Sequence, residues 1–223
     1  MAKSRGKSSS NRFNPKSPKG EVDPRRAGKL RIIAGSHRGR TLQYRGNFAT
    51  RPMKDRTREA LFSRLGGRFD GEMVFDLFAG TGILALEALS RGAGRAVVVD
   101  IIPAAAADIR SAANEFGWQN EVEVRCGDVF NQAKAIFDNR QISSDDSGAT
   151  APWLVFVCPP YSMWEDQKAE LSELLQDACD KAPVGSVFAV ELEEQTPLEL
   201  LPASLQWDVR LYRPAQVAIA EKQ

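Results

Sequence analysis

Apolar and polar residues follow two periods along residues 73–221, one typical of buried strands and one typical of helices. Short runs rich in Val, Ile and Phe indicate strands, and longer stretches with apolar residues at helical spacing separate them. The predicted strands are 73–78, 95–100, 121–126, 153–158, 186–192, 205–212 and 216–221, and the predicted helices lie near 83–91, 103–116, 129–137 and 164–181. This alternation predicts an α/β fold, with a mostly parallel, doubly wound sheet, helices on both faces and an antiparallel closing strand.

A basic hairpin is predicted ahead of this pattern. LRIIAG at 30–35 and TLQY at 41–44 have the composition of two short strands, and the polar residues between them have that of a turn. We therefore expect Arg38 and Arg40 to lie exposed on this turn, as part of a small N-terminal extension to the sheet.

The next stretch, TRPMKDRTREALFSRL, predicts a helix with a basic start. Asp55 is the expected N-cap, and apolar residues that include Leu61 and Phe62 fall on one face. Cations at a helix N-terminus oppose the macrodipole at a cost of some tenths of a kcal/mol each. A bound phosphate would remove this conflict. The cations at this helix start are Arg51, Lys54, Arg56 and Arg58.

These patterns divide the chain into three parts. Residues 1–29 are rich in Ser, Pro, Gly and Lys and have little to bury, so we expect a disordered basic tail. Residues 30–69 comprise the hairpin and the first helix, which we expect to contact a polyanion. Residues 70–223 comprise the α/β domain, in which the polar, acidic stretch 138–150 is expected to be a surface loop.

Charge is distributed unevenly along the chain. Residues 1–60 contain 17 Lys and Arg against 4 Asp and Glu, a net charge of +13, and the remaining residues carry −12. A basic arm on an acidic body favours a nucleic acid as partner, with an anionic membrane surface as the second candidate. For residues 1–29 alone, a purely solubilising tail is an equal alternative, and an organelle transit peptide ranks lower because no apolar helical face is present.

Several classes of protein are disfavoured by composition. No apolar run approaches the length of a membrane helix and the N-terminus is polar, so we expect no membrane span and no secretory signal. Three cysteines without a CxxC pair fit a reducing compartment, and we expect a soluble, cytoplasmic protein. With His37 as its single histidine, the chain has little material for a zinc site or a Ser-His-Asp triad, and no metal site is predicted.

The ends of the predicted strands indicate a nucleoside-bearing cofactor, because ligands of such sheets bind at the carboxyl ends of the strands. In DLFAGTG, residues 76–82, Gly80 and Gly82 allow a tight turn and a close backbone approach to a ligand. Asp100 ends the next strand, where it is placed to bind ribose hydroxyls, and Asp128 is a candidate partner for an adenine amino group. The predicted cofactor-binding residues are Asp76, Phe78, Ala79, Gly80, Thr81, Gly82, Asp100 and Asp128.

Asp76 distinguishes between two cofactors. Gly80, Gly82 and Ala85 also satisfy the loose dinucleotide fingerprint of dehydrogenases. A carboxylate four residues before Gly80 suits a cationic ligand better than a pyrophosphate, however, and this favours S-adenosylmethionine. The alternative interpretation is that Asp76 only caps the turn.

A further strand ends abruptly in VFVCPPY. Pro159 and Pro160 have no N–H for a sheet ladder, and Pro159 keeps Cys158 out of the α region. The strand therefore has to end here.

The motifs together resemble a known class of enzymes. DLFAGTG, VVVD, GDVF and a strand that ends in Pro-Pro-Tyr follow one another in this order, which is similar to class I S-adenosylmethionine-dependent methyltransferases that act on exocyclic amino groups. RIIAGSHRGRTL, TRPMKDRTREALF and LFAGTGILALEALSRGA more narrowly resemble the RsmD family, bacterial enzymes that methylate the 2-amino group of a guanine in 16S ribosomal RNA. The resemblance covers about residues 30–220 and implies a Rossmann-like fold.

The resemblance implies a role for the tetrapeptide Cys158, Pro159, Pro160 and Tyr161. In the family pattern an Asp or Asn opens this motif, and its side chain and the following Pro carbonyl accept hydrogen bonds from the target amine. The Tyr stacks on the base. In this chain, Pro159 would supply the carbonyl and Tyr161 the stacking face. The implied partner is 16S ribosomal RNA or the small ribosomal subunit, contacted by a monomer through Arg38, Arg40, Arg51, Lys54 and Arg56.

Cys158 departs from the family pattern, because a thiol is a weak hydrogen-bond acceptor. Three hypotheses follow. The chain is an active guanine-amino methyltransferase whose remaining acceptors suffice, or an RNA-binding protein with a methyltransferase fold and weakened or lost catalysis, or an enzyme with Cys158 as a covalent nucleophile. A dehydrogenase, or an amino methyltransferase with another substrate, is a further alternative. Cys158 is otherwise a small residue that packs at a strand end.

Overall fold

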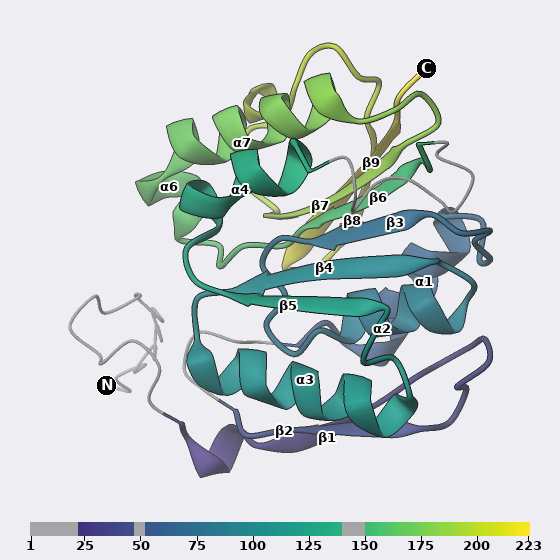
Figure 1. Cartoon of the computed structure of the whole chain (residues 1–223). Helices are drawn as coiled ribbons and strands as arrows, with labels where there is room; N and C mark the ends of the chain where they lie inside the picture. Colours follow the sequence, from purple (N-terminus) through teal and green to yellow (C-terminus); the bar gives the residue numbers. More distant parts are fainter. Residues whose placement is uncertain (1–21, 47–51, 140–149) are drawn as a thin grey trace, which may run out of the picture.

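The structure, a computed structural model, describes residues 22–46, 52–139 and 150–223. Its centre is a seven-stranded sheet in which β9 runs antiparallel between β7 and β8 and the other neighbours are parallel (Figure 1). In spatial order the strands are β5 (Val122–Cys126), β4 (Arg95–Asp100), β3 (Met73–Asp76), β6 (Trp153–Val157), β7 (Val187–Glu193), β9 (Ala215–Glu221) and β8 (Asp208–Tyr212). The order of the strands reverses between β3 and β6, and sheets of this type bind ligands at such a point.

Helices cover both faces of this sheet (Figure 1). Val155 and Phe188 belong to the core on the first face, and Val98 and Phe156 belong to the core on the second. The first face is covered by α4 (Val129–Phe137), α6 (Met163–Asp166) and α7 (Lys168–Lys181), and the second by α1 (Asp55–Arg64), α2 (Ile83–Ser90) and α3 (Pro103–Phe116). The predicted α/β architecture, a mostly parallel sheet with an antiparallel closing strand, is confirmed.

The N-terminal hairpin consists of β1 (Gly28–Arg31) and β2 (Thr41–Tyr44), which pair antiparallel and lie along α3 (Figure 1). The first strand was predicted to continue to residue 35, but it ends at Arg31. The reason lies in the backbone hydrogen bonds, because the N–H groups of Ile33 and Ala34 donate to the two carboxylate oxygens of Glu87 at 2.8 and 2.9 Å. The chain therefore leaves the hairpin to bind a buried side chain of α2.

The start of α1 also differs from the prediction. Lys54 occupies the N-cap position, and Asp55, which was the expected cap, is the first helical residue. Its carboxylate accepts a hydrogen bond from Arg58 Nη2 at 3.0 Å. Asp55 still places a negative charge in the first turn, where the helix dipole favours it, but its prediction as N-cap was wrong.

Other boundaries shift by a few residues. The helix predicted at 164–181 is two helices, interrupted at Gln167, where φ is −135°. Residues 22–29, assigned from the sequence to the basic tail, contain the 3-10 turn η1 (Pro24–Arg26) and the start of β1. A second 3-10 turn, η2 (Leu198–Leu200), precedes β8.

Two predictions concern segments beyond the described ranges. Residues 1–21 of the basic tail lie outside the described residues, as do residues 140–149 of the acidic loop. Within the three described ranges, no helix combines the length and the apolar character that a membrane span requires.

Candidate active site

Three predicted site residues lie on one face of the sheet at its carboxyl edge. Asp76 pairs with Val98 of β4, two residues before Asp100. It also pairs with Phe156 of β6, two residues before Cys158. Because alternate residues of a strand share a face, Asp100, Asp76 and Cys158 point to the same side, which is the side covered by α1, α2 and α3.

Glu191 extends this arrangement onto β7. Val157 pairs with Val190, so Cys158 and Glu191 come next on two neighbouring strands and share a face. The Tyr161 hydroxyl donates a hydrogen bond to Glu191 Oε1 at 2.8 Å. The row of four side chains across β4, β3, β6 and β7 is called the carboxyl-edge row below. It consists of Asp100, Asp76, Cys158 and Glu191.

The loop between β3 and α2 brings its backbone to this row. The Gly80 N–H donates to Asp100 Oδ2 at 2.7 Å, and the Ala79 N–H donates to the carbonyl of Val99 at 2.9 Å. Gly82 has a φ of 72°, and a Cβ atom built there would lie 2.9 Å from Ile109 Cγ1. The tight turn predicted for the two glycines is therefore present, and at Gly82 both the backbone conformation and the close approach of α3 favour glycine.

Asp76 is the most unusual residue of the site. Its side chain is 1% exposed, and neither carboxylate oxygen has a hydrogen-bond partner among the described residues. Burial raises the pKa of Asp76 to about 7, and the negative charge of Asp100 adds to the shift. The backbone N–H of Ala85 lies close enough to oppose this shift in part, although it does not meet hydrogen-bond geometry. A buried carboxylate without a partner is costly to a folded protein, so this position suits a cationic ligand, and the assignment of Asp76 to the cofactor stays a prediction.

Asp100 and Asp128 both have bonds within the protein. Asp100 accepts hydrogen bonds from the N–H groups of Gly80 and Ile102, at 2.7 and 2.8 Å, and burial raises its pKa. Asp128 caps α4 by accepting from the Phe130 N–H at 3.0 Å. A carboxylate has about four acceptor positions, so these bonds leave each side chain able to accept from a ligand. Their assignment to ribose and adenine remains a prediction.

The remaining residues of the predicted cofactor loop line the same turn. Ala79 and Thr81 are buried. Phe78 is partly buried, and its ring meets that of Phe130 edge to face, with 6.2 Å between the centroids. The ring of Phe78 in this loop therefore contacts Phe130, the residue whose N–H donates to Asp128.

The tetrapeptide begins where β6 ends, as the sequence indicated. Pro159 is buried, whereas Cys158, Pro160 and Tyr161 are half-buried. The Met163 N–H donates to the carbonyl of Pro160 at 2.9 Å, so the chain turns directly into α6. The tetrapeptide therefore lies beside Asp76 at the edge of the sheet.

Cys158 is held in the neutral thiol form. Burial raises its pKa well above the usual range, and the charges of Glu191 and Asp76 on either side raise it further. The thiolate is the reactive form of cysteine, so this environment disfavours the hypothesis of a covalent nucleophile.

The sequence analysis did not single out Glu191. The available signal was a carboxylate in the apolar run SVFAVEL, close to where that strand ends. Its significance depends on β7 lying next to β6, and the order of parallel strands is not a property of the local sequence.

Comparison with known proteins identifies the family. A family model described as "Conserved hypothetical protein 95" matches residues 30–210. The ribosomal RNA small subunit methyltransferase D of Escherichia coli (strain K12) is 31% identical over 178 residues, which are 80% of this chain and 82% of that protein. The chain belongs to the RsmD family. The resemblance described from its sequence motifs is thereby confirmed.

Solved structures share the fold of this RsmD-family chain. The structure of yhhF from Escherichia coli matches with a TM-score of 0.69 at 24% identity and covers 88% of this chain and 99% of that one. An RNA methyltransferase from Salinibacter ruber, solved in complex with S-adenosyl-L-homocysteine, matches with a TM-score of 0.51 at 17% identity, over 78% of this chain and 95% of that one. The class I methyltransferase fold is confirmed.

The basic residues predicted to contact RNA have different surroundings. Arg38, Lys54 and Arg56 are exposed. Arg40 is exposed too, but its Nη2 donates to the Glu115 carbonyl at 2.6 Å and its guanidinium lies 4.5 Å from the centre of the Phe116 ring. Arg51 lies outside the described residues.

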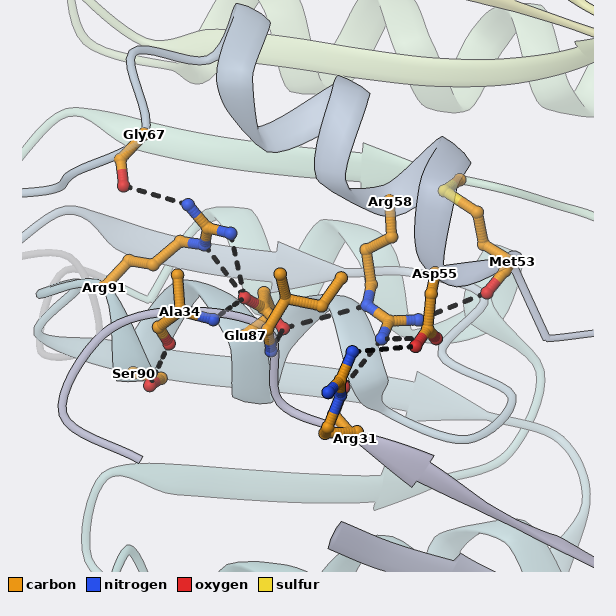
Figure 2. Close-up of polar contacts among 10 residues, drawn as sticks. Arg31, Ala34, Met53, Asp55, Arg58, Gly67, Glu87, Ser90 and Arg91 are labelled. Carbon is orange, nitrogen blue, oxygen red and sulfur yellow. Dashed lines mark hydrogen bonds and ion pairs between the residues drawn. The ribbon is translucent and has the colours of Figure 1, made fainter. Parts of the chain in front are cut away.

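Arg58 does not belong to the exposed cations at the start of α1, because its side chain is fully buried. Nη2 donates to the Arg31 carbonyl at 2.7 Å, and Nε lies 3.7 Å from Glu87 Oε2 (Figure 2). Arg91 approaches Glu87 from the other side, with Nη2 2.9 Å from Oε1. Arg58 and Glu87 therefore connect the N-terminal extension to α2, and Arg58 is not among the surface charges available to RNA.

Proposed function

We propose that this protein transfers a methyl group from S-adenosylmethionine to the exocyclic 2-amino group of a guanine in 16S ribosomal RNA. Membership of the RsmD family supports an RNA methyltransferase of this kind. One observation carries the proposal. Asp76 is buried without a hydrogen-bond partner among the described residues, and it lies one strand away from a tetrapeptide that ends in Pro160 and Tyr161.

The residues of the carboxyl-edge row fit this cofactor. The partnerless carboxylate of Asp76 suits the positively charged amino group or sulfonium of S-adenosylmethionine. Asp100 would accept hydrogen bonds from the ribose hydroxyls, and Asp128 from the adenine amino group. The backbone of the loop Phe78–Gly82 would run beside the ligand, where the absence of a side chain at Gly80 and Gly82 allows a close approach.

When bound, S-adenosylmethionine would supply an electrophilic methyl group to the lone pair of the amine; sulfur would keep the electron pair of the broken S–C bond, and the amine would lose one proton to solvent. The protein has to localise a lone pair that is otherwise delocalised into the guanine ring, and to align it for transfer. The Pro159 carbonyl would accept a hydrogen bond from the amine, and the Tyr161 ring would stack on a base taken out of its helix.

The N-terminal extension would hold the RNA. Arg38, Arg40, Lys54 and Arg56 are exposed cations on this extension, and Arg51 would add to them. Because phosphate contacts position a nucleic acid without reading its sequence, these residues would orient the substrate. The choice of base would then depend on the tetrapeptide.

The second candidate function is RNA binding with weakened or lost catalysis, and the observation that favours it is Cys158. A neutral thiol is a poor substitute for the Asp or Asn of the family pattern. Loss of a charge-assisted hydrogen bond of this kind is worth roughly 1.5 to 3 kcal/mol, or about one to two decades of rate.

A transfer assay separates the two functions. Labelled S-adenosylmethionine is incubated with the protein and either small ribosomal subunits or protein-free 16S RNA, while binding of the cofactor is measured by calorimetry. The proposed function predicts incorporation of label into at least one of the two substrates. Binding of both the cofactor and the RNA without incorporation would instead support the RNA-binding protein.

A further inference from the structure

Glu191 has a defined position beside the tetrapeptide that neither the motif nor the family pattern explains. Its carboxylate accepts a hydrogen bond from the Tyr161 hydroxyl at 2.8 Å, and its backbone carbonyl accepts one from Trp164 Nε1 at 3.1 Å. Both donors come from the segment that follows Pro160. The pairing of Val157 with Val190 brings Glu191 next to Cys158 on the same face of the sheet.

We propose that Glu191 is the acceptor carboxylate for the target amine and stands in for the side chain that Cys158 replaces. This inference rests on the proposed function, because it assigns a residue to the same reaction. It concerns a different question, namely how the chain methylates an amine without the Asp or Asn that opens the motif elsewhere in the family.

The chemistry of the side chain supports this role. An ionised carboxylate only accepts hydrogen bonds and has about four acceptor positions, so the bond from Tyr161 does not exhaust it. As the amine gains its new N–C bond, positive charge develops on nitrogen, and a fixed negative charge nearby stabilises it. The neutral thiol of Cys158 supplies neither effect.

The Tyr161 bond adds a positioning function. It connects the ring on which the base would stack to the carboxylate that would accept from the amine of that base. Trp164 also donates to the backbone carbonyl of Glu191. The Tyr161 ring and the Glu191 carboxylate are therefore held in fixed positions relative to each other before the substrate binds. Such preorganisation is a large part of what an enzyme contributes to a transfer reaction.

The alternative is that Glu191 only anchors the turn through Tyr161 and Trp164. In that case its carboxylate would act on folding or on the orientation of Tyr161, and its removal would lower kcat by the same factor whichever residue occupied position 158. The acceptor role predicts the opposite. Glu191 should matter most when residue 158 is a poor acceptor, and less when residue 158 is a good one.

This contrast defines the experiment. Methyl transfer to RNA is measured for wild type, Glu191→Ala, Cys158→Asn and the double variant, with Glu193→Ala as the matched control, because Glu193 is exposed on the same strand. We expect Glu191→Ala, which removes the acceptor, to lower kcat by roughly 10- to 100-fold, with the KM for S-adenosylmethionine within about two-fold of wild type. In the Cys158→Asn background the same substitution should lower kcat by less than about five-fold, because the carboxamide provides an acceptor.

A second readout does not depend on activity. The rate of alkylation of Cys158 is followed against pH by mass spectrometry of its peptide, which separates it from Cys126 and Cys179. Since the charge of Glu191 raises the pKa of this thiol, Glu191→Gln should shift the profile to lower pH, whereas Glu193→Gln should leave it unchanged. An unshifted profile would show that the two side chains are not neighbours and would overturn the proposal.

Other results would also overturn it. A loss of the same size in both backgrounds would assign Glu191 to the turn, and an effect of less than two-fold would remove it from the reaction. An inactive wild type with an active Cys158→Asn would show that Glu191 does not replace the missing acceptor, and it would assign the wild-type protein to the second candidate function, RNA binding with lost catalysis. If neither protein transfers methyl to RNA, the proposed function itself fails.

Discussion

Arg58 and Glu87 form an ion pair in which both side chains are fully buried, with 3.7 Å between Nε and Oε2. The two residues belong to α1 and α2, and Glu87 also accepts from the backbone of residues 33 and 34 (Figure 2). Removing one partner of a buried ion pair leaves the other charge without compensation.

Glu87→Ala is therefore expected to lower the free energy of unfolding by about 3 to 5 kcal/mol. Denaturant unfolding followed by circular dichroism measures this change. Glu59→Ala, at an exposed position of α1, is the control and should stay within about 0.5 kcal/mol of wild type. A loss below about 1 kcal/mol for Glu87→Ala would mean that the extension is held by other contacts.

Asp76 makes the stability of the ligand-free protein depend on pH. Its pKa is raised from 3.8 to about 7 in the folded state, so between these values the folded protein binds more protons than the unfolded chain does. Protonation of Asp76 therefore adds to the free energy of unfolding below about pH 4, and this addition, about 4 kcal/mol at most, is lost as the pH rises toward 7. Asp76→Asn should remove this part of the pH dependence, which unfolding curves from pH 4 to 8 would reveal. Identical curves for the two proteins would contradict the assigned environment.

The same residue should control cofactor affinity. The ionised carboxylate attracts a cation, so S-adenosylmethionine should bind more tightly as the pH rises through about 7. Asp76→Asn should weaken binding by roughly 10- to 100-fold and flatten this pH dependence. Calorimetric titration at pH 6, 7 and 8 measures both effects. Unchanged affinity in the variant would place the cofactor elsewhere.

Tyr161 is expected to act on the base and not on the cofactor. Base–aromatic stacking is worth about 1 to 3 kcal/mol, so Tyr161→Ala should lower kcat/KM for RNA by roughly 10- to 100-fold. Affinity for S-adenosylmethionine should remain within about two-fold of wild type. If turnover and cofactor affinity fell by the same factor, the proposed stacking role would be wrong.

The basic residues of the extension should determine how RNA affinity depends on salt. Each phosphate contact contributes about 0.7 to 0.9 to the slope of log affinity against log salt concentration. Replacing Arg38, Lys54 or Arg56 by Ala should reduce the slope by about that amount. Arg95→Ala is a suitable control, because Arg95 is exposed at the amino end of β4, away from the carboxyl edge. Equal slopes for all variants would move the RNA site to another surface.

Local sequence patterns were sufficient for much of this fold. Periodicity located the strands and helices of the α/β domain, and the residues that end them indicated where a ligand would bind. Tertiary contacts decided the rest. Asp55 is the first helical residue and accepts a hydrogen bond from Arg58, and Arg58 is buried beside Glu87, which belongs to another helix. Glu191 could not be recognised because its relation to Cys158 depends on which strands are neighbours.

The identity of the methylated nucleoside tests the central claim most directly. Small ribosomal subunits and 16S RNA are treated with the wild-type protein and labelled S-adenosylmethionine, digested to nucleosides and resolved by mass spectrometry. The proposed function predicts that the label is found in guanosine methylated at the 2-amino group. Label on another atom or another nucleoside, or no label although the cofactor and the RNA are bound, would contradict it.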